Sequence, residues 1–223
     1  MSQIIYCYDA YCAWCFGFSS VVSAIADKYK RVLSFEVLSG GMIIADPPKH
    51  IGVTAGYNAE NYKTVERLTG AKFGSDYLWH ILNPGESDWF PDSRKAARAL
   101  CIFKDLYPDL QVLFASELQK ALFEEGRDLC DNEAYRHLLE KYHIDPGEFY
   151  TKLSSVEYAE KAAYEFALVK QLQVTGFPVM LFQASETRFH LVARGYTDFN
   201  TADARIKAII REESQAGKRH QES

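Results

Sequence analysis

The pattern of apolar and polar positions at the start of the chain predicts a strand, a helix and a second strand. Residues 3–8 form a short, nearly continuous apolar run, which is typical of a strand buried on both faces. From residue 13 to about residue 30 the bulky apolar side chains recur at helical spacing on one stripe. Residues 32–38 again have the pattern of a strand. A strand, a helix and a strand in this order predict a parallel strand pair joined by a crossover helix.

The end of the chain has a different order of elements. Apolar runs at 179–182 and 189–193 predict two successive strands, and an amphipathic stripe predicts a helix over 199–211. The polar segment 214–223 is predicted to be disordered.

The middle of the chain is mainly helical by the same criteria. Residues 45–92 have mixed signals with several glycines and prolines, and we expect loops and short helices there. Five helices follow, and their predicted first residues or N-caps are Ser93, Leu110, Asp131, Asp145 and Ser154. Serine and aspartate at four of these starts are favoured N-cap residues.

Composition and charge narrow the class of protein. The chain has 223 residues, 48% of them hydrophobic, and this is ordinary globular composition that fits one large domain or one domain with an insertion. The formal net charge of −5, with scattered Lys and Arg, argues against nucleic-acid binding as the main task. No apolar stretch approaches the roughly 20 residues that span a membrane. The first residues do not resemble a signal peptide, so we expect a cytoplasmic protein if Met1 is the native start; a trimmed mature form would look the same.

The chain has five cysteines. They are Cys7, Cys12, Cys15, Cys101 and Cys130. An odd number in a chain of this length argues against a disulfide framework. Cys101 and Cys130 fall on predicted helical segments, where we expect them to behave as small core residues.

The closely spaced pair Cys12 and Cys15 carries the strongest chemical signal. It lies where the first predicted strand passes into the first predicted helix. A sulfur at a helix N-terminus faces unpaired N–H groups and the positive end of the helix dipole, which favour the thiolate. A cysteine three positions later lies one turn deeper. This pattern predicts Cys12 as the attacking and Cys15 as the resolving cysteine of thiol–disulfide exchange through a mixed disulfide.

Three other interpretations of the pair compete with thiol–disulfide exchange. A zinc site needs two further cysteine or histidine ligands, usually as a second close pair, and no such pair is present. A chance pairing of core cysteines rarely falls between a strand and a helix start. A structural disulfide is disfavoured by the expected cytoplasmic setting. Thiol–disulfide exchange is therefore the preferred hypothesis, and we expect no metal in the site.

A second motif precedes the strand at residues 179–182. Thr175-Gly176-Phe177-Pro178 follows a helix, and proline is tolerated at the first position of a strand. A cis bond before Pro178 would leave the Phe177 backbone free to pair with an extended peptide. From the local sequence alone, an ordinary trans proline is the more common outcome.

With both motifs in view, the whole chain resembles the DsbA-like branch of the thioredoxin superfamily. The pattern Asp9-x-x-Cys12-x-Trp14-Cys15 is similar to that of the FrnE-type cytoplasmic predicted protein-disulfide isomerases. The resemblance implies an α/β, thioredoxin-like fold with a large helical insertion. It also implies that Cys12 and Cys15 are the redox pair, that Pro178 is a cis-proline and that Phe177 tunes substrate contact. Many relatives have proline after the first cysteine, whereas this chain has Ala13. The resemblance therefore does not fix the reduction potential of the pair.

The resemblance also implies a division of the chain and a set of partners. We expect a thioredoxin-like domain over 1–56 and 151–213, an insertion subdomain over 57–150 that covers the active site, and the tail at 214–223. The expected substrates are protein or small-molecule thiols and disulfides, with glutathione as one candidate, and the only redox group needed is the dithiol. We expect no nucleic-acid or membrane partner.

Weaker candidates and rival functions remain open. Asp9 could tune the thiolate or relay a proton to Cys15, although capping the loop is the commoner role. Trp14 could be a flat contact for substrate or could pack on the insertion. One rival function is that of the glutathione-dependent kappa-class transferases and chromene-carboxylate isomerases, which have a similar fold but use serine in place of the redox pair. The other rival is a non-catalytic scaffold, against which the retention of both cysteines argues.

Overall fold

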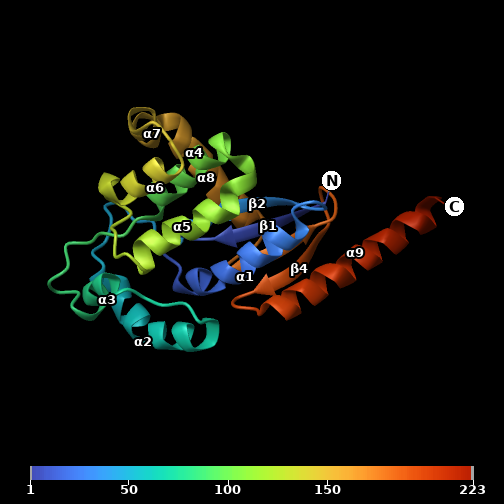
Figure 1. Cartoon of the computed structure of the whole chain (residues 1–223), viewed down its shortest axis with the longest axis horizontal. Coiled ribbons are helices and arrows are strands. Elements are labelled where there is room, and N and C mark those ends of the chain that lie inside the picture. Colours follow the sequence, from blue (N-terminus) through green and yellow to red (C-terminus); the bar gives the residue numbers. More distant parts are fainter. Residues whose placement is uncertain (1, 222–223) are drawn as a thin grey trace.

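The computed structural model describes residues 2–221 and contains a four-stranded sheet with helices around it (Figure 1). The strands are β1 (Gln3–Tyr8), β2 (Ser34–Ser39), β3 (Val179–Gln183) and β4 (Phe189–Arg194). The α-helices are α1 (Ala13–Tyr29), α2 (Gly52–Thr69), α3 (Ser75–Leu82), α4 (Ser93–Leu106), α5 (Gln111–Phe123), α6 (Arg136–Lys141), α7 (Pro146–Leu153), α8 (Val156–Gln171) and α9 (Phe199–Gln221). None of the helices in this part of the chain is long and apolar enough to cross a membrane.

The strand order is β2-β1-β3-β4, and this order places the two sequence motifs next to each other. β1 is parallel to β2, as the opening pattern predicts, and antiparallel to β3. In the register of β1 and β3, Cys7 pairs with Val179. The turn that follows β1 and the loop that precedes β3 therefore lie at the same end of the sheet, although they are more than 150 residues apart in sequence.

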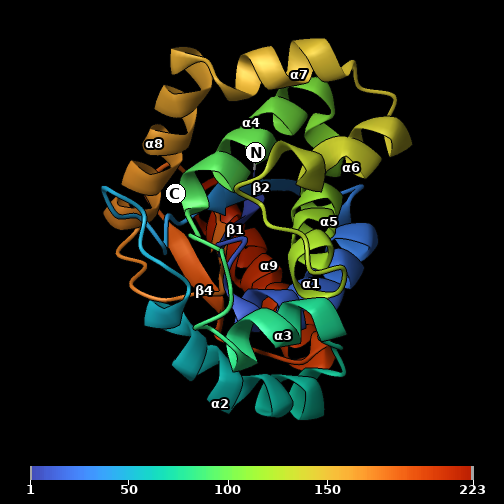
Figure 2. The same ribbon diagram turned by 90° about the vertical axis from the view of Figure 1, so that its left-hand side faces the viewer.

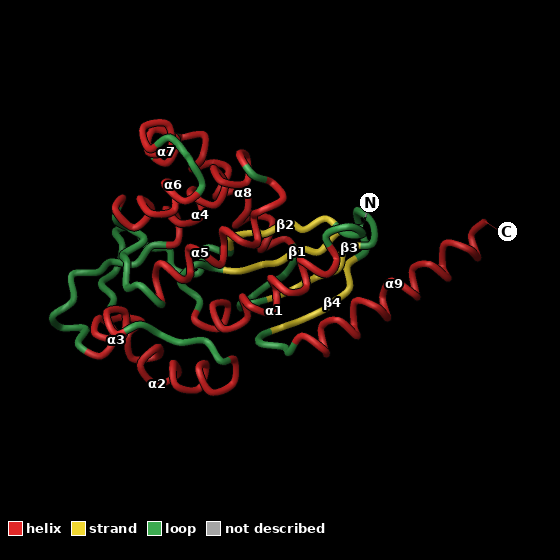
Figure 3. Tube along the Cα trace, in the orientation of Figure 1, coloured by secondary structure: helices red, strands yellow, loops and turns green. Residues whose placement is uncertain are grey.

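Alternation along β1 divides the core into two faces. Tyr6 and Tyr8 belong to the large cluster that includes α1 and α5, whereas Cys7 packs with Val169 of α8 on the opposite face. The tube view shows α1 running along the strands, with α9 beside β4 (Figure 3). Burial on both faces explains why β1 has an almost continuous apolar sequence.

The helical residues between β2 and β3 form two groups. Viewed toward one end of the sheet, α2 and α3 lie on one side and α4, α6, α7 and α8 lie on the other (Figure 2). The predicted boundary at residue 57 falls inside α2, which begins at Gly52. α2 is also longer than the short helices expected there. Only Ala55 and Val65 of this helix are buried, so its apolar stripe is too sparse to identify it.

Two predicted helix caps are displaced by one residue. Asp92, not Ser93, caps α4, because its carboxylate accepts from the Arg94 N–H. Ser155, not Ser154, caps α8. In both cases a favoured cap residue stands next to another one. The Ser93 hydroxyl is already engaged with Asp9.

The polar C-terminal segment continues the last helix. The tail predicted at 214–223 is helical as far as Gln221, and residues 222–223 lie outside the described residues. Figure 1 shows this end of α9 extending away from the sheet. Residues 214–221 include glutamine, alanine, lysine and arginine, which have high helix propensity and can propagate a helix that is already formed.

Candidate active site

The first helix begins at the reactive pair. Cys12 is the N-cap of α1 and has extended backbone angles, φ −86° and ψ 107°. Its Sγ accepts a hydrogen bond from the N–H of Cys15 at 3.2 Å. The sulfur thus takes the place that a serine or aspartate oxygen usually occupies at a cap, where a negative charge is favoured. This local geometry places the Cys12 sulfur at the N-terminal end of α1.

The two cysteines differ in their access to solvent. Cys12 is 5% exposed and lines a cavity of about 460 Å³, whereas Cys15 is fully buried beneath it. Both are free thiols in this structure. Burial raises the pKa of the Cys15 thiol well above its ordinary value, and the hydrogen bond to Cys12 raises it further. The pair therefore consists of an outer sulfur at a cavity wall and an inner one held as the thiol.

Asp9 is a buried carboxylate that holds three segments around the pair. One oxygen accepts from the Tyr11 N–H and the Ser93 hydroxyl, both at 3.0 Å, and the other accepts from the Met42 N–H at 2.7 Å. Burial raises the pKa of Asp9, while these hydrogen bonds act in the opposite direction. Asp9 thereby connects the active-site turn with the segment after β2 and the start of α4.

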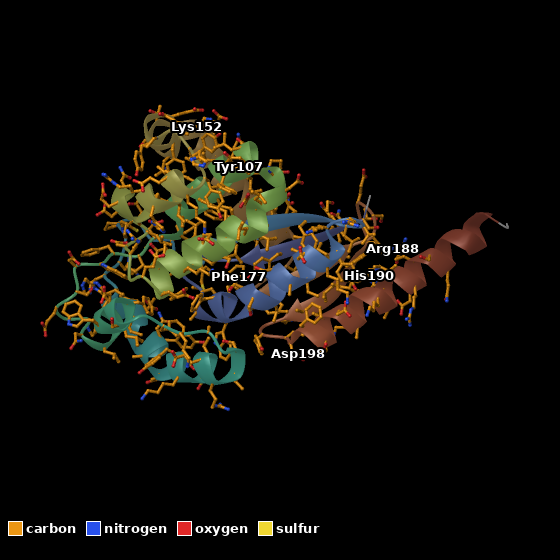
Figure 4. All side chains as sticks on the ribbon, viewed as in Figure 1. Tyr107, Lys152, Phe177, Arg188, His190 and Asp198 are labelled. Carbon is orange, nitrogen blue, oxygen red and sulfur yellow. The ribbon has the colours of Figure 1, made fainter. Side chains whose placement is uncertain are left out.

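The loop before β3 completes one wall of the cavity. The Phe177–Pro178 peptide bond is cis, as the resemblance implies, and the side chain of Phe177 faces the same cavity as Cys12. Figure 4 shows Phe177 between the sheet and α2. No hydrogen bond to the Phe177 backbone is found within residues 2–221, so its N–H and C=O are available to a bound chain.

Gly40 makes the position of Phe177 possible. A Cβ built on Gly40 would lie 1.9 Å from the Phe177 ring, so no other residue fits there without moving the ring. Gly40 directly follows β2, and its N–H donates to Tyr8 O at 2.7 Å. The end of β2 thus packs directly against the Phe177 side chain.

The remaining walls come from residues that the sequence did not identify. They are Tyr11, Met42, Ile43, Val53, Thr54, Tyr57 and Asn58. Val53 and Tyr57 are mostly exposed apolar side chains on α2. Trp14 is half-buried and lines the same cavity, as does Ala13. α2 thus covers one side of the Cys12 sulfur. In the sequence, the only sign that this helix belongs to the site is an apolar face on a mainly polar helix.

The other cysteines do not line the cavity. Cys7 packs on the opposite face of the sheet, and Cys101 is buried in α4. Cys130 is half-buried and lies 3.3 Å from the Tyr11 hydroxyl. Within the described residues no group of three or more histidine, cysteine or acidic side chains is arranged to hold a metal ion.

Comparison with known families identifies the fold independently. The model of the DSBA-like thioredoxin domain matches residues 3–207. The chain belongs to this family. The match covers both cysteines, the Pro178 loop and all the helices between β2 and β3. No curated protein matches this DSBA-like chain in sequence.

Solved structures similar to this DSBA-like protein cover nearly its whole length. A proposed protein disulfide isomerase from Nitrosomonas europaea is 20% identical, with a TM-score of 0.82 over 95% of this chain and 98% of the other. The cytosolic disulfide reductase DsbM from Pseudomonas aeruginosa is 21% identical, with a TM-score of 0.76 over 94% and 98%, and has also been solved with GSH. A 2-hydroxychromene-2-carboxylate isomerase is 14% identical, with a TM-score of 0.62 over 97% and 98%. At these identities the likeness shows the shared fold.

Proposed function

We propose that this DSBA-like protein is a thiol–disulfide oxidoreductase that works through Cys12 and Cys15. The observation that carries the proposal is the arrangement of the pair. Cys12 lies at the wall of a 460 Å³ cavity with its sulfur bonded to the Cys15 N–H, and Cys15 lies fully buried beneath it. An accessible nucleophile over a hidden second thiol suits two successive exchange steps.

In the first step the Cys12 thiolate attacks one sulfur of a substrate disulfide. A bond forms between Cys12 and that sulfur, and the other substrate sulfur leaves as a thiolate. In the second step Cys15 loses its proton and attacks the Cys12 sulfur. The intramolecular disulfide forms and the second substrate thiol leaves, so the substrate gains two electrons and the pair loses two. The reverse sequence oxidises a substrate.

The cavity walls suit the substrate classes expected from the sequence. Apolar and aromatic side chains, among them Trp14, Phe177 and Tyr57, surround the sulfur, and the Phe177 backbone can pair with an extended chain. Protein disulfides and small disulfides are therefore the proposed substrates. Glutathione is included because the similar DsbM has been solved with GSH. The dithiol itself carries the electrons, so the proposal needs no further cofactor, and the similarity to cytosolic DsbM supports a cytosolic location.

The reduction potential of the pair is the decisive measurement. The protein is equilibrated with mixtures of reduced and oxidised glutathione, quenched with acid and alkylated, and the Cys12–Cys15 disulfide is quantified by mass spectrometry. We expect one reversible two-electron transition, whose midpoint also gives the favoured direction of electron flow. Absence of an intramolecular disulfide at every ratio contradicts the proposal. Conjugation of glutathione to an electrophile, with no redox transition, would instead favour the glutathione-transferase branch.

A further inference from the structure

A second large cavity lies against α4 and the end of α7, and it shares no lining residue with the cavity at Cys12. Its volume is about 560 Å³, which falls in the range of roughly 300–1,000 Å³ that is usual for small-molecule sites. Figure 2 shows α7 beside α4. The proposed exchange steps use none of the polar side chains that line this cavity, which include Arg94, Lys95 and Arg98 of α4, Cys130, Asn132 and, directly after α7, Ser154.

Helix α4 brings three cationic side chains to this cavity. Arg98 follows Arg94 by four positions and Lys95 by three, so all three lie on one side of the helix. Arg94 is neutralised locally, because its guanidinium donates to both oxygens of the Asp92 carboxylate and also to the Ala45 carbonyl. The positive charge that is left over comes from Lys95 and Arg98.

Lys95 and Arg98 have backbone partners but no carboxylate partner. The Lys95 ammonium donates to Cys130 O at 2.6 Å. Arg98 Nη1 donates to Leu153 O at 3.4 Å. Within residues 2–221 neither side chain forms an ion pair, and the buried Nε–H of Arg98 has no acceptor. Such an unsatisfied donor is uncommon in proteins. The Arg98 guanidinium is thus held by one long hydrogen bond and is free to turn toward a ligand in the cavity.

Partial burial distinguishes these two cations from unpaired ones at the surface. Arg67 on α2 also lacks an ion pair within residues 2–221, but it is exposed, so water solvates its charge. Lys95 and Arg98 are half-buried, and removing a cation from water costs free energy unless an anion compensates for it. In agreement with this, burial lowers the pKa of Lys95. A bound anion would supply the compensation.

The acidic groups that act on Lys95 do not fill this role. Burial outweighs their effect on its pKa, which negative charges at Cys130, Asp131 and Asp128 raise. Neither of the two carboxylates lines the cavity, and the backbone engages both of them. Asp128 accepts from the Cys130 N–H at 2.8 Å, and Asp131 accepts from the Glu133 N–H at 3.2 Å. The charge balance of the cavity therefore favours an anionic ligand.

We propose that this cavity binds a small organic molecule through a phosphate or carboxylate group, with Arg98 and Lys95 as the anion-binding residues. The N–H groups of a guanidinium match two oxygens of such a group, and the Lys95 ammonium adds a point charge with further donors. The side chains of Asn132 and Ser154 have no hydrogen-bond partner within residues 2–221, so they are available to the rest of the ligand. The proposal goes beyond the exchange reaction and does not depend on it, because the two cavities are separate.

Calorimetric titration of the reduced protein tests the site with two probes, pyrophosphate for the phosphate class and citrate for the carboxylate class. NaCl keeps the ionic strength constant, so that screening is the same in every sample. We expect saturable binding of at least one probe to one site, and a Kd raised on the order of tenfold or more by Arg98→Gln and by Lys95→Gln. Arg98→Lys keeps the charge but not the planar fork, and it should raise the Kd less. Arg67→Gln is the matched control and should leave the Kd unchanged.

Alkylation locates the bound anion, because each of the two cavities is lined by one cysteine. Cys130 lines the cavity against α4, and Cys12 lines the other one. With N-ethylmaleimide we expect the probe that binds to slow the modification of Cys130 and to leave that of Cys12 unchanged. Peptide mass spectrometry over a time course measures both rates in the same sample.

Three results would overturn the proposal. They are the absence of saturable binding for both probes, an equal rise of the Kd in Arg98→Gln and Arg67→Gln, and protection of Cys12 in place of Cys130. Tighter binding of pyrophosphate assigns the site to phosphates, and tighter binding of citrate assigns it to carboxylates. Lys95→Gln keeps the titration informative if Arg98→Gln folds poorly. Failure of the proposed function would appear separately, in the reduction potential of the cysteine pair, which is measured without either probe.

Discussion

The Sγ atom of Cys12 accepts a hydrogen bond from the backbone N–H of Cys15 at 3.2 Å, so the outer sulfur caps the helix on which the inner one lies. The helix start therefore holds the two residues at different depths, with the outer sulfur at the positive end of the helix dipole. The chemical difference between two identical side chains follows from this geometry.

Alkylation should distinguish the two sulfurs. With iodoacetamide at mildly acidic pH we expect Cys12 to be modified first, because it lines the cavity, while Cys15 is buried, has a raised pKa and is modified only after unfolding. Peptide mass spectrometry over a time course identifies the labelled residue. Earlier labelling of Cys15 would contradict the assignment of roles.

Substituting Cys12 or Cys15 singly should disrupt disulfide exchange at two different steps. Cys12→Ser should abolish disulfide exchange, because the nucleophile is lost. Cys15→Ser should accumulate a mixed disulfide on Cys12, because nothing displaces the bound substrate. Non-reducing mass spectrometry after addition of a disulfide substrate measures both. Cys130→Ala is the matched control, for which we expect near-normal turnover; loss of turnover in this variant with the fold intact would extend the redox chemistry beyond one pair.

Gly40 should be needed for substrate binding rather than for the reactivity of Cys12. Gly40→Ala places a Cβ within 1.9 Å of the Phe177 ring, which must then move away from the cavity wall. We expect the KM for a disulfide substrate to rise several-fold, while the rate of Cys12 alkylation stays within about twofold.

The control for Gly40 is another glycine of the cavity region. Gly56 lies in α2, and a Cβ there meets nothing within 4 Å. Gly56→Ala should leave KM unchanged and stabilise the protein by up to about 1 kcal/mol through helix propensity. Equal effects of the two substitutions on KM would argue against a specific role for the contact between Gly40 and Phe177.

The contribution of Asp9 to the free energy of unfolding should fall as the pH rises. Burial raises its pKa in the folded state above the value of about 3.9 in the unfolded chain. Between the two values the folded state binds more protons than the unfolded state. The free energy of unfolding therefore falls as the pH rises from the unfolded pKa through the folded pKa.

The variant Asp9→Asn isolates this contribution. It cannot titrate, so the loss of stability over this pH window should be absent from it. Urea unfolding of both proteins at a series of pH values, with the difference plotted against pH, checks the expectation. A constant difference across the window would show that Asp9 binds its proton equally well in the folded and the unfolded protein.

Several features of this protein follow from the local sequence. The apolar run of β1, the stripe of α1 and the position of the cysteine pair between them are local signals, and the structure shows all three. The reason is that helix periodicity, strand burial and capping act over a few residues, within the reach of a sequence pattern. The family and the cis bond before Pro178 followed from a resemblance, since locally a trans bond was the commoner expectation.

Only the tertiary structure decided what surrounds the pair. The pairing of β1 with β3 brings Phe177 to the cavity of Cys12, and a sparse apolar stripe hides α2, which supplies Val53 and Tyr57. The carboxylate of Glu165 on α8 accepts from the Ser39 N–H of β2 and from Lys104 of α4, which are elements far apart in sequence. Such contacts depend on which elements pack together, and burial, unlike periodicity, is a property of the assembled core.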